Sequence, residues 1–496
     1  MKISELIFSN EYTSAGGDLN VEIQNITTDY NEISDNTLFV FIRSAVFDIN
    51  NIKETVLKRR PIAIICDREL SLPSSAESVI IRVENTRKVL PYLFFRFYEL
   101  TEKNLKICAV TGTNGKTSTA TMLQKILTKE GYKVGFIGTG RIAINDRLIN
   151  EQNYSMTTPD PKMLYSTIKN MTAENCDYIV MEVSSHALYF DKVLPLRFSV
   201  SIFTNLSEEH LDFHESLDAY FKTKMKLFSQ SDLAVFNSDD EYSKRASEAF
   251  KLKKLTVGTK NKADLIATNI KSVGYKNTEY YANEINKRYK VKLNIGGSFN
   301  VYNSLMAIAA AKLLGVSCIS AKAAISEISG IDGRMECIEG DVTVIIDYAH
   351  TPEAMKNVLF SLYSSKIPEQ SIITVFGCGG NRDKSKRPKM ARIAERYSDK
   401  VIVTTDNSRF EKSSDIIKDI LSGFTDNSKR TVITSRSQAI EYAILNAKDG
   451  DIIAVIGKGH ERYNIVNGTY ENFDEREIIH NALEKRRSLK QNDNKA

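Results

Sequence analysis

Short apolar runs alternate with stretches of helical periodicity along most of this chain. The run at 105–110 is apolar almost throughout, whereas in 119–129 the apolar residues recur at helical spacing. Between 104 and 332, similar apolar runs predict strands at 105–110, 133–137, 178–183, 199–204 and 233–236. Because strands that alternate with helices form parallel sheets, we expect a mostly parallel sheet covered on both faces.

A second series of apolar runs begins after Gly333 and predicts another doubly wound sheet, with strands at 342–347, 371–376, 400–405, 431–434 and 451–456. Residues 1–103 contain short strands such as 36–42 and 61–66. A chain of 496 residues exceeds what one hydrophobic core normally supports. We therefore expect an α/β fold in three domains, at 1–103, 104–332 and 333–496, followed over 484–496 by a frayed, charged tail.

Composition narrows the class of protein. Hydrophobic residues make up 42% of the chain and charged residues 26%, as in ordinary globular proteins. The 67 basic and 62 acidic residues nearly balance, which argues against a nucleic-acid partner. The six cysteines lack metal-ligand spacing, and neither a signal peptide nor a membrane-spanning run is visible. We expect a cytoplasmic protein with reduced thiols and no membrane insertion.

The segment 109–119 carries the most specific chemical signal. It reads Ala-Val-Thr-Gly-Thr-Asn-Gly-Lys-Thr-Ser-Thr and joins a strand to a helix, as do the Gly-rich turns that cradle nucleotide phosphates. Only the second half of the general pattern is met, because Val110 stands where a Gly is usual. The alternative to a phosphate-binding turn is an ordinary strand–turn–helix in which Gly-Lys-Thr occurs by chance. The turn predicts an ATP site formed by Gly112, Thr113, Asn114, Gly115, Lys116, Thr117 and Ser118, with the Thr117 hydroxyl able to bind Mg²⁺.

Polar side chains gather where the predicted strands end, which is where open α/β sheets bind ligands. The strand at 178–183 ends near Glu182, whose buried charge needs either a Mg²⁺ ion or a neighbouring Arg or Lys. Five of the six histidines lie at or just beyond strand ends: His186, His210, His214, His350 and His460. Any one of them could be a structural histidine, and that alternative stays open above all for His186 and His214.

Other candidates are weaker by themselves. Tyr220 and Lys224, four residues apart, share one face of a predicted helix, yet its composition favours a solvated basic surface. Arg334 lies at a predicted domain junction. Further polar segments follow the later strands, at 347–352, 376–384, 406–409 and 457–461.

Seven motifs follow one another along the chain: Gly-Thr-Asn-Gly-Lys-Thr, Glu-Val-Ser-Ser-His, Thr-Asn-Leu-Ser-x-x-His-Leu-Asp, Gly-Arg-Met-Glu, Asp-Tyr-Ala-His-Thr-Pro, Gly-Cys-Gly-Gly-x-Arg-Asp and Gly-Lys-Gly-His-Glu. In this order they resemble the Mur ligase family and, within it, the UDP-N-acetylmuramoyl-tripeptide synthetases. The resemblance is strong from about 105 to 478 and weak before. It implies a small N-terminal domain for the UDP end of a substrate, a central P-loop ATPase and a Rossmann-like C-terminal domain that brings an amino acid.

The resemblance also implies an ATP-dependent reaction of peptidoglycan assembly. ATP would phosphorylate the free carboxylate of D-Glu in UDP-MurNAc-L-Ala-D-Glu, and the amine of a diamino acid would attack the acyl phosphate. The implied catalytic residues are Lys116, Arg334, His210 and Lys224. Two Mg²⁺ ions would be held by Thr117, Glu182, His210 and by Lys224 after carbamylation by CO₂.

The same matching implies three groups of binding residues. Asn303, Asp347 and His350 would contact the nucleotide together with the turn at 112–118. The muramyl-peptide contacts would be Thr157, Thr158, Ser184, Ser185 and Lys192. The pocket for the third amino acid would consist of Arg382, Asp406, Asn407, Arg409, Gly457 and Glu461, where Glu461 would hold an ammonium and the arginines carboxylates.

Two segments depart from the family pattern. Ser408 replaces the Pro of the usual Asp-Asn-Pro-Arg, but Arg409 remains, and a guanidinium suits the distal carboxylate of meso-diaminopimelate. We therefore expect meso-diaminopimelate as the amino-acid substrate. Without the proline the loop loses a fixed φ and some rigidity, so lysine, ornithine and lanthionine remain alternative substrates. At 29–31 the chain reads Asp-Tyr-Asn where Asp-Ser-Arg is common, and Lys192 replaces an Arg. Both changes leave the uridine and sugar contacts open.

Two other readings remain. A sibling ligase could add a different amino acid to a muramyl peptide, or glutamate to folate, but Asn407, Arg409 and Glu461 favour the third-residue enzyme. A non-catalytic paralogue could bind the same ligands and regulate a partner, although the implied catalytic residues are intact. We expect a monomer that closes its domains around the substrates.

Overall fold

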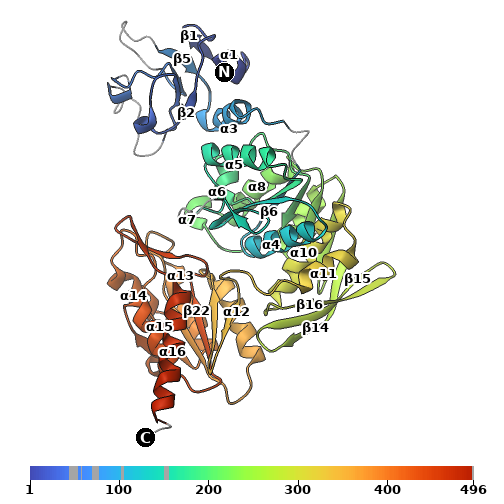
Figure 1. Ribbon diagram of the computed structural model, residues 1–496, viewed down its shortest axis with the longest axis vertical. Helices are drawn as coiled ribbons and strands as arrows, with labels where there is room; N and C mark the ends of the chain where they lie inside the picture. Colours follow the sequence, from blue (N-terminus) through green and yellow to red (C-terminus); the bar gives the residue numbers. More distant parts are fainter. Residues whose placement is uncertain (44–53, 57, 70–77, 102–105, 150–155, 494–496) are drawn as a thin grey trace.

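The computed structural model describes residues 1–43, 54–56, 58–69, 78–101, 106–149 and 156–493. These residues form three lobes that follow one another along the long axis of the molecule, from the N-terminal lobe at one end to the C-terminal lobe at the other (Figure 1). Each lobe has its own sheet with helices packed on it. The α/β fold class predicted from the alternation of patterns is confirmed.

The N-terminal lobe is built on a mostly parallel sheet with the strand order β1-β5-β4-β3-β2. Its strands are β1 (Ser14–Gly16), β2 (Asn25–Thr27), β3 (Thr37–Val40), β4 (Ala63–Cys66) and β5 (Val79–Arg82). The predicted strands at 36–42 and 61–66 are β3 and β4, and every residue in both is buried.

Short helices flank this sheet and connect it to the rest of the molecule. They are α1 (Ile3–Leu6), the 3-10 helix Tyr30–Glu32 and α3 (Thr86–Phe97). Helix α3 packs against α5 (Pro161–Ala173) of the central lobe. The predicted boundary between 103 and 104 lies outside the described residues.

The central lobe is built on one long sheet with the strand order β16-β15-β14-β13-β12-β11-β6-β10-β7-β8-β9. Its parallel middle strands are β6 (Ile107–Thr111), β7 (Val134–Gly138), β10 (Tyr178–Glu182), β11 (Val200–Phe203) and β12 (Ala234–Asn237). They match the five predicted strands closely, except that residue 105 is not described. Since Glu182 pairs in register with Val110, the end of β10 lies beside the start of the Gly-rich turn.

Further strands extend this sheet at both ends, and the alternation of patterns did not predict them. They are β8 (Arg141–Ile144), β9 (Arg147–Leu148), β13 (Lys254–Gly258), β14 (Leu265–Val273), β15 (Asn277–Glu284) and β16 (Lys287–Leu293). The strands β14, β15 and β16 pair antiparallel. Buried and more exposed residues alternate along β15, because one face of this extension packs against α10 (Phe299–Leu313) and α11 (Cys318–Ser326).

The helices of the central lobe connect and cover the parallel strands. They include α4 (Lys116–Lys129), α6 (Ser185–Tyr189), α7 (Leu211–His214), α8 (Leu217–Phe228) and α9 (Glu241–Ala249). Helix α4 follows the Gly-rich turn, covers the predicted helix at 119–129 and packs against α10. The first turn of α4 is thereby fixed at the carboxyl end of β6.

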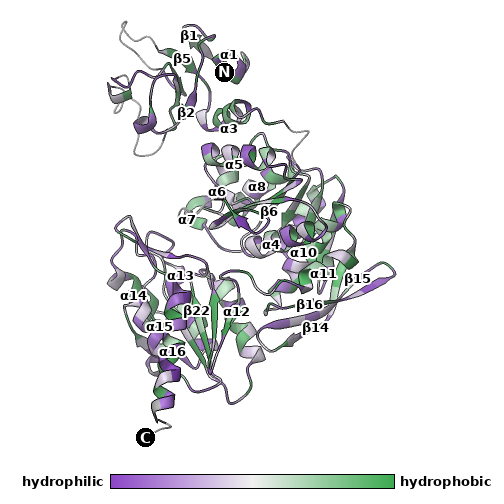
Figure 2. Ribbon diagram, viewed as in Figure 1, coloured by the Kyte–Doolittle hydropathy of each residue, from purple (hydrophilic) through white to green (hydrophobic). Residues whose placement is uncertain are grey.

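The C-terminal lobe has the strand order β17-β18-β22-β19-β20-β21, with β17 antiparallel to its neighbour. Its strands are β17 (Glu336–Glu339), β18 (Thr343–Asp347), β19 (Ile372–Phe376), β20 (Lys400–Val403), β21 (Arg430–Val432) and β22 (Ile452–Ile456), with a hairpin of β23 (Tyr463–Val466) and β24 (Thr469–Asn472). The middle strands are strongly hydrophobic (Figure 2). The predicted second series is therefore confirmed.

Helices cover both faces of this sheet. They are α12 (Pro352–Ser365), α13 (Lys386–Tyr397), α14 (Ser413–Leu421), the 3-10 helix Asn427–Lys429, α15 (Arg436–Asn446) and α16 (Glu475–Asp493). No helix in the part of the chain that the structure describes combines the length and the apolar character needed to cross a lipid bilayer.

The last described residues form a helix, so the expectation of a frayed tail over 484–496 is wrong up to residue 493. Helix α16 packs along α15, and Arg486 is only 6% exposed. Its Nη1 donates to the carbonyl of Ile444 and its Nη2 to Asp449, both at 2.7 Å. The sequence was misleading because this end of the helix is largely hydrophilic (Figure 2) and shows no apolar packing pattern. It is held instead by the hydrogen bonds of one buried charged residue, Arg486.

We predict that Arg486→Ala destabilises the C-terminal lobe and that Arg487→Ala, which removes an exposed side chain on the same turn, does not. The carbonyl of Ile444 lies in the last turn of α15, where carbonyls lack helical partners, so losing its charged donor costs about 1–3 kcal/mol. The midpoint of thermal unfolding measures the effect. Equal midpoints for the two variants would contradict the anchoring role.

Candidate active site

The Gly-rich turn between β6 and α4 has the backbone that phosphate-binding turns require. Gly112 and Gly115 have φ values of +145° and +83°, which other residues rarely adopt. A Cβ at Gly115 would also collide with Oδ1 of Asn303. The amide of Asn114 donates to Oδ1 of Asn205 at 2.9 Å, and Lys116 Nζ donates to the carbonyls of Gly112 and Thr113 at 2.9 and 2.8 Å.

The carboxylate of Glu182 lies buried beside this turn, with no exposed surface. Its Oε2 accepts hydrogen bonds from the hydroxyls of Thr117 at 3.0 Å and Thr139 at 3.1 Å, and its Oε1 accepts from the Thr139 amide at 3.0 Å. Among the described residues, no lysine or arginine forms an ion pair with Glu182, which speaks against the alternative of a structural pair. The arrangement leaves a hydrogen-bonded negative charge next to the first turn of α4.

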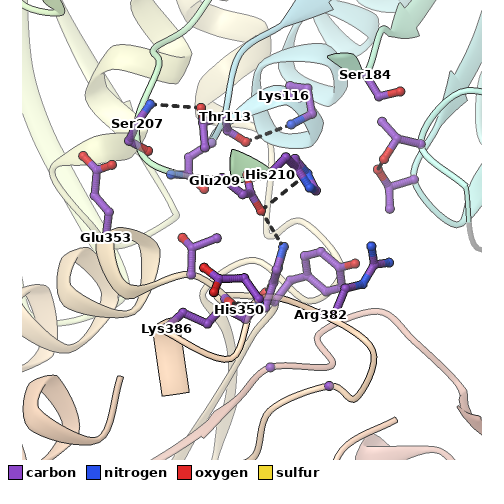
Figure 3. A pocket seen from close by; sticks show the side chains of 18 of the residues that line it. Thr113, Lys116, Ser184, Ser207, Glu209, His210, His350, Glu353, Arg382 and Lys386 are labelled. Carbon is purple, nitrogen blue, oxygen red and sulfur yellow. Dashed lines mark hydrogen bonds and ion pairs between the residues drawn. The ribbon is translucent and has the colours of Figure 1, made fainter. Parts of the chain in front are cut away.

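A second acidic centre, Glu209, lies beside the turn on the same side of the cavity (Figure 3). His350 Nε2 lies 3.1 Å from Oε1 of Glu209, and His210 Nε2 lies 3.8 Å from the same oxygen (Figure 3). Burial alone would raise the pKa of Glu209, but the hydrogen bond and charge of His350, with smaller effects of His210 and Lys116, hold it well below its ordinary value. Burial lowers the pKa of His210 to about 3, so this ring is neutral near pH 7.

The two histidines left open by the sequence pack among aromatic rings. His186 stacks on Phe213 with the ring centroids 4.3 Å apart, and His214 stacks on Tyr220 at 4.7 Å. His214 Nε2 also lies 3.0 Å from the hydroxyl of Ser185, which is buried. These contacts favour a structural role for His214, whereas His186 also lines the cavity described below.

Helix α8 buries one of its three lysines, which corrects the composition-based reading of a solvated basic helix. Lys224 is 1% exposed, while Lys222 and Lys226 are exposed. The ammonium of Lys224 lies 3.5 Å from Oγ1 of Thr111 and 4.5 Å from the ring centre of Tyr220. Burial, and then the positive charge of Lys116, lower the pKa of Lys224 well below its ordinary value.

Residues of the C-terminal lobe reach the Gly-rich turn. Arg334 Nη2 donates to Oγ1 of Thr117 at 3.0 Å, and its guanidinium lies over the ring of Tyr348. Asp347 accepts the amides of Met335 at 2.7 Å and Ala349 at 2.8 Å, and burial raises its pKa. Asp347 therefore fixes the loops that carry Arg334 and Tyr348.

A cavity of about 1020 Å³ opens between the central and C-terminal lobes. Figure 3 shows His350, Arg382 and Lys386 on its C-terminal side, opposite Thr113 and Lys116. Most of the residues implied by the resemblance line it: Thr113, Asn114, Gly115, Lys116, Thr117, Thr157, Thr158, Glu182, Ser184, Lys192, His210, Arg334, His350, Arg382, Asp406, Asn407, Arg409, Gly457 and Glu461. Six other implied residues lie behind this wall: Gly112, Ser118, Ser185, Lys224, Asn303 and Asp347.

The C-terminal end of the cavity is a polar pocket. Asn407 is 3% exposed, and its Nδ2 donates to Oε2 of Glu461 at 2.7 Å. Arg409 has a φ of +53°, and its Nη1 donates to the carbonyl of Gly380 at 3.0 Å. Ser408 is buried between them, so the loop is packed even without a proline.

On the opposite side, a chain of hydroxyls connects the cavity wall to Glu182. Thr158 Oγ1 donates to the carbonyl of Glu182 at 3.0 Å and accepts the amide of Ser184 at 3.0 Å. The hydroxyl of Thr139, which donates to Glu182, lies 3.1 Å from that of Thr157 and can accept from it. Lys192 forms an ion pair with Asp160 at the rim.

Sequence reasoning assigned no role to Thr139, Asn205 or Glu209. Glu209 occupies an unspecified position of the motif Thr-Asn-Leu-Ser-x-x-His-Leu-Asp, directly before His210, so its place beside a strand-end histidine could have marked it. Asn205 is the Asn of the same motif, whereas Thr139 lacked such a signal. They reach the site because β7, β10, β6 and β11 lie next to one another in the sheet.

Comparisons with known proteins agree with this arrangement. A family model described as the Mur ligase middle domain matches residues 110–311, and one described as the Mur ligase, glutamate ligase domain matches 333–459. The UDP-N-acetylmuramoyl-L-alanyl-D-glutamate–2,6-diaminopimelate ligase 1 of Clostridium acetobutylicum is 38% identical over 485 residues, covering 97% of this chain and 98% of that protein. The ligase of the same type from Parabacteroides distasonis is 37% identical over 486 residues, with 97% and 98% covered.

Solved structures show the same architecture. One of a UDP-N-acetylmuramoyl-L-alanyl-D-glutamate–2,6-diaminopimelate ligase has a TM-score of 0.68 and 26% identity, covering 98% of this chain and 99% of that one. A folylpolyglutamate synthase of Mycobacterium tuberculosis has a TM-score of 0.63 at 15% identity, covering 74% and 92%, which shows likeness of fold alone. With two family models matched over more than half of its length and relatives of 37–38% identity along nearly all of it, this chain belongs to the Mur ligase family.

Proposed function

We propose that this protein is an ATP-dependent ligase that joins the third amino acid, meso-diaminopimelate, to UDP-MurNAc-L-Ala-D-Glu. One observation carries the proposal. A single cavity is lined by the Gly-rich turn, by Thr157 and Thr158, and by a pocket that contains Arg382, Arg409 and Glu461. The names of the relatives give the same two substrates. We further propose that it acts in the cytoplasm as a monomer, with domains at 1–103, 104–332 and 333–496.

The chemistry follows from the poor reactivity of a carboxylate toward amines. Phosphorylation of the D-Glu side chain by ATP turns one oxygen into a leaving group, and the amine then displaces phosphate through a tetrahedral intermediate. Two anions must meet in the first step, so fixed cations are needed. Lys116 at the turn and Arg334 from the C-terminal lobe would neutralise the phosphates, and the amides at the start of α4 would add their partial charge.

Mg²⁺ suits the oxygens beside the turn. Thr117 Oγ1 and Glu182 Oε2 lie 3.0 Å apart and present a hydroxyl and a buried carboxylate, the ligands that this ion prefers. The described residues contain no group of three His, Cys, Asp or Glu side chains that could hold a metal by themselves. We propose that His210 and Lys224 add to Thr117 and Glu182 once the nucleotide is bound. When bound, Mg²⁺ would offset phosphate charge and orient the transferred group.

Lys224 would join this set as a carbamate. Its lowered pKa supports a neutral amine, whose lone pair can attack CO₂ with loss of a proton to give a carboxylate-like group. The burial that disfavours an ammonium there disfavours any unpaired charge, so the carbamate would need the cation beside it.

The remaining cavity residues fit the two organic substrates. Arg382 and Arg409 would hold carboxylates of the diamino acid, and Asn407 with Glu461 an ammonium, with Asp406 and Gly457 as further contacts. Lysine and ornithine lack the distal carboxylate for which the arginines are suited, whereas lanthionine carries it. We propose Asn303, Asp347 and His350 as nucleotide contacts, and Thr157, Thr158, Ser184, Ser185 and Lys192 as muramyl-peptide contacts.

We predict that the purified protein, given ATP, Mg²⁺, UDP-MurNAc-L-Ala-D-Glu and a mixture of meso-diaminopimelate, lysine, ornithine and lanthionine, forms mainly the diaminopimelate product. Mass spectrometry of the product identifies the amino acid. A dominant lysine product would defeat the substrate assignment. Absence of both ADP and any longer peptide would defeat the function and would favour the non-catalytic alternative.

Lys224→Ala should lose at least about tenfold in kcat, the loss typical of disturbed metal sites, and acetate or propionate should restore part of it by replacing the carbamate. Lys222→Ala, on the exposed face of the same helix, serves as the control. Its kcat should equal that of the unmodified protein both with and without the added carboxylate. An active Lys224→Ala variant, or one that no short carboxylate rescues, would count against the carbamate.

Gly115→Ala should weaken binding of Mg·ADP at least tenfold, about 1.4 kcal/mol, because the new methyl group meets Asn303 and strains the turn. Gly131→Ala is a matched control at the other end of α4. Its φ is +91°, but no atom lies within 4 Å of its added Cβ, so it tests backbone strain alone. Isothermal titration calorimetry with Mg·ADP measures the affinity of both variants. Equal affinities of Gly115→Ala and Gly131→Ala would contradict the role of the turn.

A further inference from the structure

Lys458 is a fully buried lysine behind the polar pocket of the C-terminal lobe. Its side chain is 0% exposed and it does not line the cavity. The ammonium donates to Oδ1 of Asn407 at 3.0 Å and lies 3.6 Å from Oε2 of Glu461. The rings of Tyr463 and Phe473 lie 5.8 and 5.6 Å from it. Lys458 therefore touches two residues of the pocket from the side away from the ligand.

These contacts decide which way the Asn407 amide points. Oδ1 of Asn407 faces the Lys458 ammonium and also the backbone amide of Ile465, at 2.9 Å. Both neighbours can only donate, so the atom they face must be the amide oxygen. Nδ2 is then directed at Oε2 of Glu461, 2.7 Å away. Without Lys458 the amide would lose the stronger of the two donors that hold this orientation.

The same ammonium balances two buried carboxylates. Burial by itself would raise the pKa of Asp406, but the charges of Lys458 and then Arg436 hold it below its ordinary value. Burial and the charge of Asp406 raise the pKa of Glu461, and Lys458 opposes that shift. Lys458 is thus a cation that acts on both carboxylates, and Arg436 and Arg409 also act on Asp406.

We propose that Lys458 is a positioning residue that makes the pocket selective for an amino acid with a distal ammonium group, by fixing Asn407 and Glu461 as the site for that group. The inference rests on the proposed function, in which the distal end of a diamino acid enters this pocket. The nucleophilic amine points toward the phosphorylated carboxylate, so the ammonium held by Asn407 and Glu461 is the second one. Lys458 acts on the ligand only through these two side chains.

The test compares two substrates that differ by one amine, meso-diaminopimelate and 2-aminopimelate. The ratio of their kcat/KM values measures recognition of the distal ammonium. Lys458→Met removes the charge and keeps an unbranched stem that suits the neighbouring rings. Lys458→Gln keeps a polar end without the charge, so the two variants cover the case in which an apolar side chain prevents folding. Lys448→Met removes an exposed lysine of the same lobe as the control.

We expect either Lys458 variant to lower the ratio at least tenfold, mainly by raising KM for meso-diaminopimelate. The KM values for ATP and UDP-MurNAc-L-Ala-D-Glu should stay within twofold of the unmodified protein, and Lys448→Met should change none of them. A merely structural role would depress turnover of both amino acids equally and leave the ratio unchanged, which would overturn the proposal. If the unmodified protein turns over neither amino acid, the proposed function itself fails, and that result is separate from an unchanged ratio.

Discussion

The site depends on one buried negative charge at the carboxyl end of β10. Glu182 has no exposed surface and is stabilised by the hydroxyls of Thr117 and Thr139 and by the Thr139 amide. A carboxylate buried without such partners would cost several kcal/mol, so the end of β7, the end of β10 and the first turn of α4 must keep their relative positions. A divalent cation beside Glu182 would gain from the same burial, because fewer water dipoles screen the attraction.

The cavity belongs to two lobes at once. Arg334 reaches Thr117, and His350 reaches Glu209, so residues from the C-terminal sheet complete a site whose base is the central sheet. This division suits a ligase that must bring an amine to an activated acid and then release a larger product. The central lobe contributes the Gly-rich turn to this cavity, and the C-terminal lobe contributes the polar pocket around Asn407 and Glu461.

A buried lysine lies near each end of this cavity, and each is held by neighbouring side chains. Lys224 lies over Tyr220 near the Gly-rich turn, and Lys458 lies against Asn407 and Glu461 behind the polar pocket of the C-terminal lobe. Buried ions are weak contributors to stability because desolvation offsets their attraction. Their presence here therefore indicates function, in which directed charges matter more than the free energy of folding.

The sequence by itself determined the α/β class, the parallel middle strands of the central and C-terminal sheets, two strands of the N-terminal sheet and the motifs at strand ends, because apolar periodicity and Gly-rich turns are local signals. It also identified Lys116, Glu182, His210 and Arg334 as candidates. Only the tertiary structure decided that Lys224 is buried while Lys222 and Lys226 are not, that Ser185 faces His214, and that Thr139 and Lys458 support the site. The antiparallel extension β14–β16 and the anchored helix α16 were likewise visible only in three dimensions. The physical reason is that burial and hydrogen-bond partners depend on which distant strands and helices become neighbours. The local sequence of a single segment does not determine those neighbours.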